Sequence, residues 1–197
     1  MRRLIIGISG ASGAIYGIRM LEALHKVPEL ETHLILSASA GQTILDETDW
    51  KVADVKALAS VVHNPKDIGA SLSSGSFKTD GMIVAPCSVK TLSGIVNSYD
   101  DNLLTRAADV CLKEARRVVL LVRETPMHLG HIDLMARAAR YGAIVMPPVP
   151  AFYHRPKTLD DMINQTVGKA LDLFNISHTL FKRWKETEGS GFGPTSP

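Results

Sequence analysis

The first seventeen residues hold the feature that most constrains the fold of this chain. A short apolar run, Leu4–Ser9, is typical of a buried strand, and a turn of small residues then leads into a helical pattern over Ala14–Lys26. The turn reads Gly7-x-x-Gly10-x-x-Gly13, and its glycines permit the backbone to approach a ligand closely. The N–H groups at a helix start favour a phosphate. The spacing differs from the usual dinucleotide motif, so an ordinary strand-to-helix connection is the alternative interpretation.

Four more apolar runs of strand length follow along the chain. They are Thr32–Ser37, Met82–Pro86, Val118–Val122 and Ala143–Met146. Stretches of helical periodicity, such as Asn102–Lys113, lie between them. Strands that alternate with helices predict right-handed crossovers and a parallel sheet covered on both faces, which is a three-layer α/β/α Rossmann-like (flavodoxin-like) fold. Ligands of such sheets bind at the carboxyl ends of the strands.

The composition is that of an ordinary globular domain. The 197 residues are 45% hydrophobic and 21% charged, and the net charge of +2 argues against nonspecific nucleic-acid binding. We expect one domain over 1–188, a flexible loop at Ser71–Ser76, and a flexible C-terminal tail over 189–197. Cys87 and Cys111 belong to no CxxC motif, and no signal peptide or membrane span is apparent. These features predict a cytoplasmic protein.

Polar residues follow the predicted strands at the edge where a ligand binds. Ser37 comes after the second strand, where an NAD site normally has an acidic residue, and the chain contains no GxxxxGK[ST] phosphate loop. Pro86–Thr91 places small hydroxyl residues at a helix start, which offers donors to a ligand; an ordinary N-cap serine is the alternative. Arg123 follows the next strand and is a candidate anion contact, with a surface ion pair as the alternative.

Several cationic residues lie on or near predicted helices. They are Arg106, Lys113, Arg155 and Lys169. Each alone is typical of a solvated charge, whereas together they can hold a second phosphate. His128 and His131 are three residues apart on a predicted helix, but no suitably spaced cysteine or carboxylate completes a zinc motif. We interpret the two histidines as surface or capping residues, and the sequence predicts no metal site.

Six short motifs occur in order along the chain and together resemble one family. They are Gly7–Gly13, Pro86–Ser93, Arg106–Val110, Leu112–Glu114, Val122–Pro126 and Pro147–Pro156. In this series the chain closely resembles the flavin prenyltransferases, once described as aromatic-acid decarboxylase subunits, over roughly Arg3 to Trp184. The resemblance implies the fold of the flavin-containing cysteine-decarboxylase superfamily. It also implies a metal-independent transfer of the dimethylallyl group of dimethylallyl phosphate to N5 and C6 of reduced FMN.

The resemblance further implies a role for particular residues of this chain. The FMN-binding residues are Gly10, Ala11, Ser12, Ser37, Ser88, Val89, Lys90, Thr91 and Arg123. The residues expected to bind dimethylallyl phosphate are Arg106, Lys113, Tyr153 and Lys169, and the catalytic residues are Ser12, Lys113, Glu124 and Tyr153. Some relatives have an aromatic residue near the flavin in the segment that matches Ile68–Ser76, but this chain has no tryptophan there.

The resemblance also implies partners. The family typically forms a dodecamer with sites at trimer contacts, and its product serves a partner UbiD-type aromatic-acid decarboxylase. An apolar face of a C-terminal helix, formed by Leu171, Phe174, Leu180 and Trp184, is a candidate contact between copies. One alternative is an FMN-dependent cysteine decarboxylase, for which His63 is the nearest candidate catalytic histidine. Those enzymes have a substrate-clamp motif after the late prolines, whereas this chain has Phe152–Pro156 there. The other alternative is a non-enzymatic flavin-binding subunit of an aromatic-acid decarboxylase.

Overall fold

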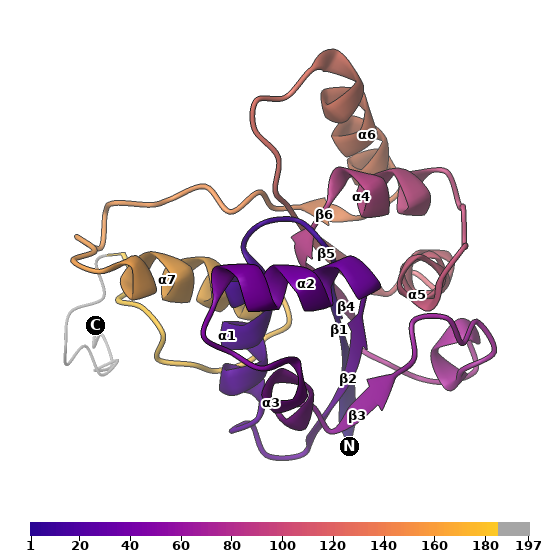
Figure 1. The fold of residues 1–197 in the computed structure, drawn as a ribbon, viewed down its shortest axis with the longest axis horizontal. Coiled ribbons are helices and arrows are strands. Elements are labelled where there is room, and N and C mark those ends of the chain that lie inside the picture. The colour runs from indigo at the N-terminus through magenta and orange to yellow at the C-terminus, as the bar shows by residue number, and fades with distance from the viewer. Residues whose placement is uncertain (185–197) are drawn as a thin grey trace, which may run out of the picture. The chain divides into compact units, whose positions relative to one another are not determined.

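The computed structural model describes residues 1–184, which fall into two compact units. The first unit is Met1–Pro148, and the second begins at Val149. The prediction of a single domain over 1–188 stays a prediction, and the predicted tail over 189–197 lies outside the described residues. The first unit contains a six-stranded parallel sheet with helices around it (Figure 1).

The strands run in the order β3-β2-β1-β4-β5-β6. Their bounds are β1 (Arg2–Ile8), β2 (Leu30–Leu36), β3 (Val61–His63), β4 (Gly81–Cys87), β5 (Arg117–Val122) and β6 (Ile144–Val145). Every pairing is parallel, which confirms the predicted sheet. Without the short edge strand β3 the order is that of flavodoxin, and with β3 it is the Rossmann order. The order reverses between β1 and β4, and this switch point is where such sheets bind ligands.

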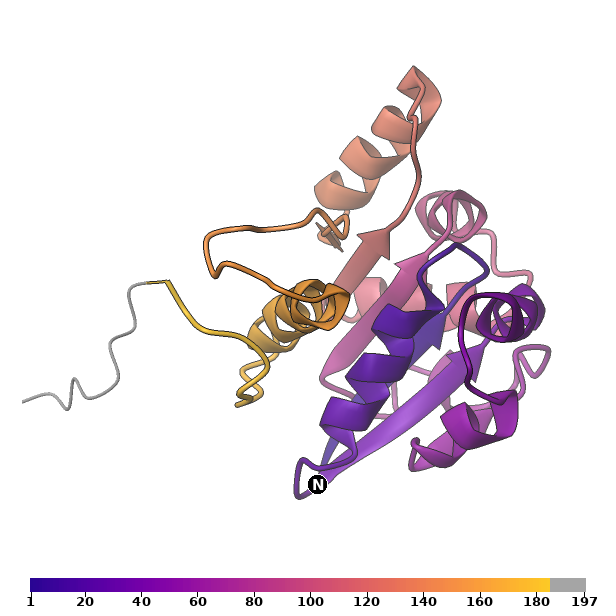
Figure 2. The ribbon, with the colours of Figure 1, turned by 60° about the vertical axis from the view of Figure 1, so that its left-hand side comes forward.

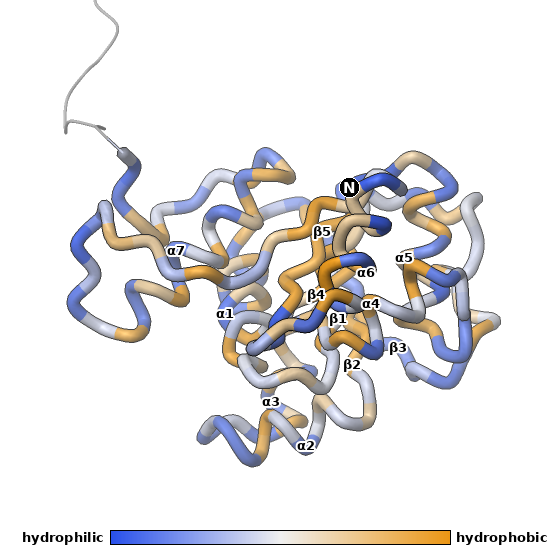
Figure 3. The backbone as a smooth tube through the Cα atoms, turned by 90° about the horizontal axis from the view of Figure 1, so that it is seen from above, coloured by the Kyte–Doolittle hydropathy of each residue, from blue (hydrophilic) through white to orange (hydrophobic). Residues whose placement is uncertain are grey.

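Helices of the first unit lie on both faces of this sheet (Figure 2). They are α1 (Ala14–Leu24), α2 (Ala38–Glu47), α3 (Val52–Ala57), α4 (Val89–Val96), α5 (Leu103–Lys113) and α6 (Leu129–Arg140), with a 3-10 turn η1 (Ser71–Ser73). One core cluster joins strand residues such as Met82 and Leu120 to Leu92 of α4 and Leu104 of α5. Figure 3 shows the strands as largely hydrophobic segments, whereas the helices alternate between hydrophobic and hydrophilic residues. The predicted periodicities therefore correspond to buried strands and amphipathic helices.

Helix α1 approaches the sheet closely because of its glycines. Gly13 has a φ of 98°, a left-handed conformation that favours glycine, and it forms the N-cap of α1. A Cβ at Gly17 would collide with the Ala85 carbonyl oxygen of β4, so only glycine permits this helix–strand contact. The small residues of the opening motif thus bring the start of α1 to the carboxyl edge of β1 and β4.

The second unit contains α7 (Leu159–Asp172), which Thr158 and Asp161 cap in a reciprocal capping box. The sequence predicted an apolar helix face formed by Leu171, Phe174, Leu180 and Trp184, and this prediction is wrong in its geometry. Helix α7 ends at Asp172, so three of the four residues lie beyond it, and Leu171 and Phe174 are buried. Only Trp184 is largely exposed, at 66%. That face is therefore not the exposed apolar surface that we expected.

Two smaller predictions concern cysteines and the membrane. Both cysteines are buried and free, and burial raises the pKa of Cys87 to about 12 and that of Cys111 to about 11. Their thiols are therefore small core groups rather than nucleophiles. Among residues 1–184, no helix is both long enough and apolar enough to cross a bilayer.

Candidate active site

A cavity of about 500 Å³ lies at the carboxyl edge of the sheet, in the first unit. Three strand ends contribute to its wall: Gly10 follows β1, Ser37 and Ser39 follow β2, and Ser88 follows β4. Other lining residues come from α4 and from the connection to α5, and they include Lys90, Thr91, Asn97, Tyr99, Asn102 and Thr105. The cavity therefore occupies the switch point of the sheet, and its wall is rich in hydroxyl groups.

Two helices begin at this cavity, and each has a serine N-cap. The Ser37 Oγ accepts a hydrogen bond of 3.1 Å from the Ala40 N–H at the start of α2. The Ser88 Oγ accepts one of 3.2 Å from the Thr91 N–H at the start of α4 and donates one of 3.1 Å to the Thr91 Oγ1. The positive ends of two helix dipoles therefore lie at the same wall, a position that favours an anion. The N-cap interpretation of Ser88 is confirmed; because its hydroxyl hydrogen is donated to Thr91, the binding of a ligand by Ser88 stays a prediction.

Ser9 stands in the opening turn, where a serine can donate to a ligand, but its hydroxyl has a different role. Its side chain is 1% exposed; the Oγ donates to the Pro86 carbonyl at 2.8 Å and accepts from the Ser88 N–H at 2.8 Å. Both hydrogen-bonding directions of the hydroxyl are used inside the protein. Ser9 therefore fixes the turn after β1 to the turn after β4, and it is not a donor to the cavity.

The turn between β1 and α1 also binds a carboxylate that the sequence analysis missed. The Gly13 N–H donates a 2.7 Å hydrogen bond to Oε2 of Glu47, the last residue of α2. A carboxylate at the C-terminus of its own helix is unfavourable, whereas at the N-terminus of α1 it is stabilised. This charge at an unfavourable helix end was the signal available in the sequence. A Cβ at Gly10 would collide with Ser39 on the other side of the turn.

Arg123 follows β5 directly, as predicted, and its N–H donates to the Cys87 carbonyl at 3.0 Å. Within residues 1–184, no hydrogen bond or ion pair engages its guanidinium, so the surface ion pair is not observed. Its charge does act on Tyr16 of α1: burial raises the pKa of the Tyr16 hydroxyl, and the Arg123 charge lowers it in part. Arg123 is thus a cation beside the first turn of α1.

The predicted phosphate-binding cations on α5 are held by carboxylates. The Arg106 Nη1 pairs with Asp100 at 3.1 Å and with Asp109 at 3.3 Å. The Lys113 Nζ pairs with Glu114 at 2.6 Å. Lys113 is the last residue of α5, about 12 Å along the axis from the first turn that lines the cavity, at 1.5 Å per residue. A single chain therefore does not bring Lys113 to the cavity wall.

Tyr153 and Lys169 belong to the second unit, where one helix face brings them together. The Gln165 Nε2 of α7 donates to the Tyr153 Oη at 3.4 Å. Lys169 follows Gln165 by four residues, which places both on one side of α7. The predicted pair therefore shares one side of α7, with the exposed amine of Lys169 one turn from the Tyr153 contact.

The structure also locates the histidines that the sequence analysis singled out. His63 lies in the edge strand β3, and its Nε2 is 2.9 Å from the His33 Nδ1. It lines a second cavity, of about 460 Å³, rather than the cavity at the switch point. His128 caps α6 by accepting a 3.0 Å hydrogen bond from the Gly130 N–H. Between residues 1 and 184, no three His, Cys, Asp or Glu side chains gather as metal ligands would.

Comparison with known proteins decides the family. The family model described as Flavoprotein matches residues 1–178. The flavin prenyltransferase UbiX of Escherichia coli is 63% identical over 187 residues, which cover 94% of this chain and 99% of the relative. The chain belongs to the flavin prenyltransferase family. A UbiX of Thauera aromatica is 59% identical over 186 residues, 94% of this chain and 95% of the relative.

Solved structures of flavin prenyltransferases have the same fold. The crystal structure of AnUbiX (PadA1) in complex with FMN and dimethylallyl pyrophosphate has a TM-score of 0.92 and 48% identity, and covers 95% of this chain and 99% of that chain. A dodecameric FMN-dependent UbiX-like decarboxylase from Escherichia coli has a TM-score of 0.91 and 48% identity, over 93% of this chain and 100% of that chain. The FMN-dependent cysteine decarboxylase TvaF shares the fold, with a TM-score of 0.66 at 16% identity, over 89% of this chain and 99% of that chain.

In this flavin prenyltransferase, the cavity gathers five of the residues predicted to bind FMN. They are Gly10, Ser37, Ser88, Lys90 and Thr91. Ala11 and Ser12 follow Gly10 in the same turn, and Val89 is the first residue of α4. Glu124 follows Arg123, and its Oε1 accepts a 3.0 Å hydrogen bond from the Thr125 N–H. The structure thus brings five of the nine predicted FMN residues to one cavity wall, whereas Lys113 ends α5 and Tyr153 and Lys169 belong to the second unit.

Proposed function

We propose that this chain joins the dimethylallyl group of dimethylallyl phosphate to N5 and C6 of reduced FMN. The observation that carries the proposal is the convergence of three polar strand ends on one cavity, in a chain 63% identical to a flavin prenyltransferase. The structural relative in complex with FMN and dimethylallyl pyrophosphate supports both the cofactor and the class of donor. The absence of an acidic residue after β2 agrees with a flavin mononucleotide rather than with NAD.

The residues of the cavity fit FMN. Its volume of about 500 Å³ lies within the range of small-molecule sites. The first N–H groups of α2 and α4, helices that Ser37 and Ser88 cap, suit a phosphate and a ribityl chain. The turn that starts at Gly10 closes against Ser39, so this wall is formed by backbone rather than by bulky side chains.

The chemistry requires few protein groups. Reduced FMN, when bound, supplies the nucleophilic nitrogen and carbon. Loss of phosphate from an allylic carbon develops negative charge on the leaving oxygen, which the amines of Lys113 and Lys169, the Arg106 guanidinium and the Tyr153 hydroxyl stabilise. Ring closure adds a proton to the prenyl double bond and removes one from flavin C6, and Glu124, or the released phosphate, relays the proton between them. The protein otherwise acts by positioning the two reactants.

The complete site requires more than one copy of the chain. Lys113 stands at the far end of α5 from the cavity of its own chain, so we assign it to the site of a neighbouring copy. The dodecameric relative at 48% identity supports an assembly of this kind. The prenylated flavin then passes to a partner UbiD-type aromatic-acid decarboxylase, and we place the reaction in the cytoplasm.

Mass spectrometry of the flavin tests this function directly. The protein is incubated anaerobically with reduced FMN and dimethylallyl phosphate, and in a parallel arm with dimethylallyl pyrophosphate. We expect the flavin to gain the mass of one prenyl group in at least one arm. Unmodified flavin in both arms would contradict the proposal and leave a flavin-binding subunit as the better interpretation. The cysteine decarboxylase alternative is not favoured, because His63 is away from the cavity and bonded to His33.

A further inference from the structure

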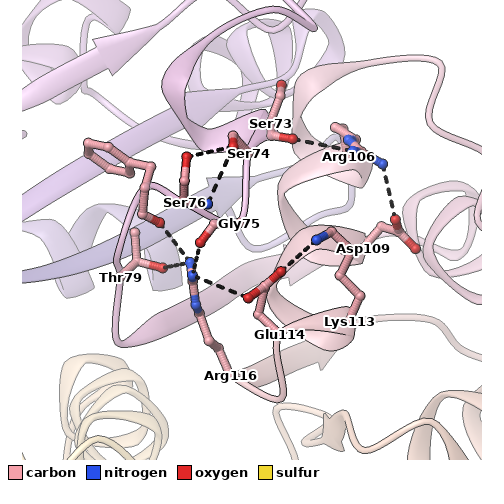
Figure 4. A network of polar contacts seen from close by, with 11 residues as sticks. Ser73, Ser74, Gly75, Ser76, Thr79, Arg106, Asp109, Lys113, Glu114 and Arg116 are labelled. Carbon is pink, nitrogen blue, oxygen red and sulfur yellow. Dashed lines mark hydrogen bonds and ion pairs between the residues drawn. The ribbon is translucent and has the colours of Figure 1, made fainter.

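The serine-rich segment after η1 is fixed to α5 by two arginines (Figure 4). The Arg106 Nη2 donates to the Ser73 carbonyl at 3.3 Å. The Arg116 Nη1 donates to the Phe77 carbonyl at 2.8 Å and to the Thr79 Oγ1 at 3.4 Å, and its Nη2 donates to the Gly75 carbonyl. Composition predicted a flexible loop here. The structure shows instead that its backbone carbonyls are bound to cations.

Arg116 is placed for this role by the way that α5 ends. Ala115 has a φ of 53°, a left-handed conformation, and the Arg116 N–H donates back to the Cys111 carbonyl at 2.8 Å. The reversal turns the Arg116 side chain toward the loop, where it is only 11% exposed. A cation this buried requires acceptors on several sides, and the loop supplies most of them. The cation and the loop therefore stabilise each other.

The loop in turn confines Glu114, which holds Lys113. A Cβ at Gly75 would collide with the Glu114 carboxylate, so the loop backbone lies directly against it. The Oε1 of Glu114 accepts the 2.6 Å contact from the Lys113 Nζ, and its Oε2 is 4.0 Å from the Arg116 Nη2. Hydrogen bonding to Lys113, with the Arg116 charge as a further cause, keeps the pKa of Glu114 below its ordinary value. The carboxylate is thus ionised between two cations.

We propose that Arg116 is a positioning residue for prenyl transfer: it clamps the Ser73–Thr79 loop against the end of α5 and, through Glu114, fixes the amine of Lys113. This inference rests on the proposed function, in which Lys113 binds the phosphate of the donor. The Ser73–Thr79 loop contains no tryptophan. Arginine bonds to the loop carbonyls hold it in place.

The conservative variant Arg116→Lys tests the clamp. Lysine keeps the positive charge but cannot bridge the carbonyls of Gly75 and Phe77 with a rigid fork. We expect KM for dimethylallyl phosphate to rise roughly tenfold or more, as for the loss of one charge-assisted contact, while the affinity for FMN changes little. The matched control is Arg117→Lys, which changes the exposed arginine next in the chain and should keep the KM of the wild type.

Glu114→Gln tests the link to Lys113 independently of the clamp. The amide keeps the shape of the side chain but removes the charge between the two cations, so KM for the donor should again rise. In the double variant with Arg116→Lys, the fold-rise in KM should be smaller than the product of the fold-rises in the two single variants, since both residues act through one network. Multiplicative effects would contradict a shared path.

The outcomes separate this inference from the function on which it rests. If the wild-type protein leaves the flavin unmodified, the proposed function fails. If the wild type prenylates the flavin but Arg116→Lys keeps the KM of the wild type, the positioning role alone fails. Equal losses of FMN binding, folding and donor affinity in Arg116→Lys would also overturn it, because they would show a general structural role.

Discussion

At the scale of single residues, a hydroxyl that binds no ligand organises the site. Ser9 joins the turns after β1 and β4 through two buried hydrogen bonds, to the Pro86 carbonyl and from the Ser88 N–H. Ser12, three residues later, is exposed, and its contact with FMN stays a prediction. The two serines look alike in the motif, and only their surroundings separate them.

Ser9→Ala should therefore destabilise the protein. It leaves the partly buried Ser88 N–H without its acceptor, which costs about 1–3 kcal/mol of unfolding free energy, while the Pro86 carbonyl keeps its 3.2 Å bond from the Ser9 N–H. Ser12→Ala is the matched control and should stay within about 0.5 kcal/mol of the wild type. Urea unfolding followed by circular dichroism, at one protein concentration, measures both. Equal stability of the two variants would show that the bridge contributes nothing.

A chain of titratable groups around the buried His33 predicts how stability depends on pH. The His33 Nε2 is 2.6 Å from Glu31, and its Nδ1 is 2.9 Å from the His63 Nε2. An ionised Glu31 only accepts, so the His33 Nε2 carries the proton and its Nδ1 accepts from His63. Arg3 pairs with the same carboxylate at 3.1 Å, the Phe77 ring packs edge-on against His33, and the Asp67 charge acts on His63.

Stability should decrease as the pH falls below about 6.5. Burial lowers the pKa of His33 and of His63, so the unfolded chain binds these protons before the folded protein does. The bond from His33 lowers the pKa of Glu31, and the stability that it contributes is likewise lost on acidification. Urea unfolding at pH 7.5 and 5.5 measures the difference, and His63→Gln should reduce it. A larger free energy of unfolding at pH 5.5 would contradict the assignment.

At the scale of the elements, the contact of α1 with the sheet depends on Gly17. Gly17→Ala places a Cβ against the Ala85 carbonyl and within 2.7 Å of the Ile8 side chain, which should destabilise the protein by about 1–3 kcal/mol. The matched control is Gly41→Ala in α2, where the nearest atom is 4.0 Å away. That variant should stabilise the protein by about 0.5–1 kcal/mol, because alanine favours a helix. Thermal unfolding measures both variants, since the melting temperature should fall for Gly17→Ala and rise for Gly41→Ala.

The division of the site between elements predicts the behaviour of two variants. In the proposed function FMN binds at the turns after the strands, whereas Lys169 of α7 and Tyr153, which Gln165 of α7 contacts, serve the donor. Tyr153→Phe and Lys169→Ala should each lose about 1.5–3 kcal/mol of donor or transition-state binding and keep the affinity for FMN. Flavin titration and single-turnover transfer are measured on the same proteins. Loss of FMN binding in proportion to activity would refute this division.

At the scale of the whole molecule, the proposed site requires association. Lys113 does not reach the cavity of its own chain, and a relative with a TM-score of 0.91 is dodecameric. We expect sedimentation at micromolar concentration to give a mass several times the 21.4 kDa of one chain. A stable species near 21.4 kDa that still prenylates FMN would rule out a site shared between copies.

The sequence by itself determined the sheet and the ends of its strands. Apolar runs of strand length that alternate with helical periodicity have few stable solutions, and a parallel sheet covered on both faces is the common one. The strand β3 escaped prediction, because three residues with an exposed Val61 and Val62 carry no periodic signal. The end of α7 also escaped prediction, because the spacing of Leu171 and Phe174 is typical of one helical face, although the helix ends at Asp172.

Only the tertiary structure decided which polar groups face the cavity and which are used internally. Ser9 and Ser12 share a motif, but a hydrogen bond to Pro86, seventy-seven residues away, decides the role of Ser9. Glu47 reaches Gly13 across 34 residues, and Arg116 reaches Gly75 across 41. Local sequence encodes propensity and periodicity, which are short-range. The pairing of polar groups depends on distances set by the packed sheet, which no local pattern contains.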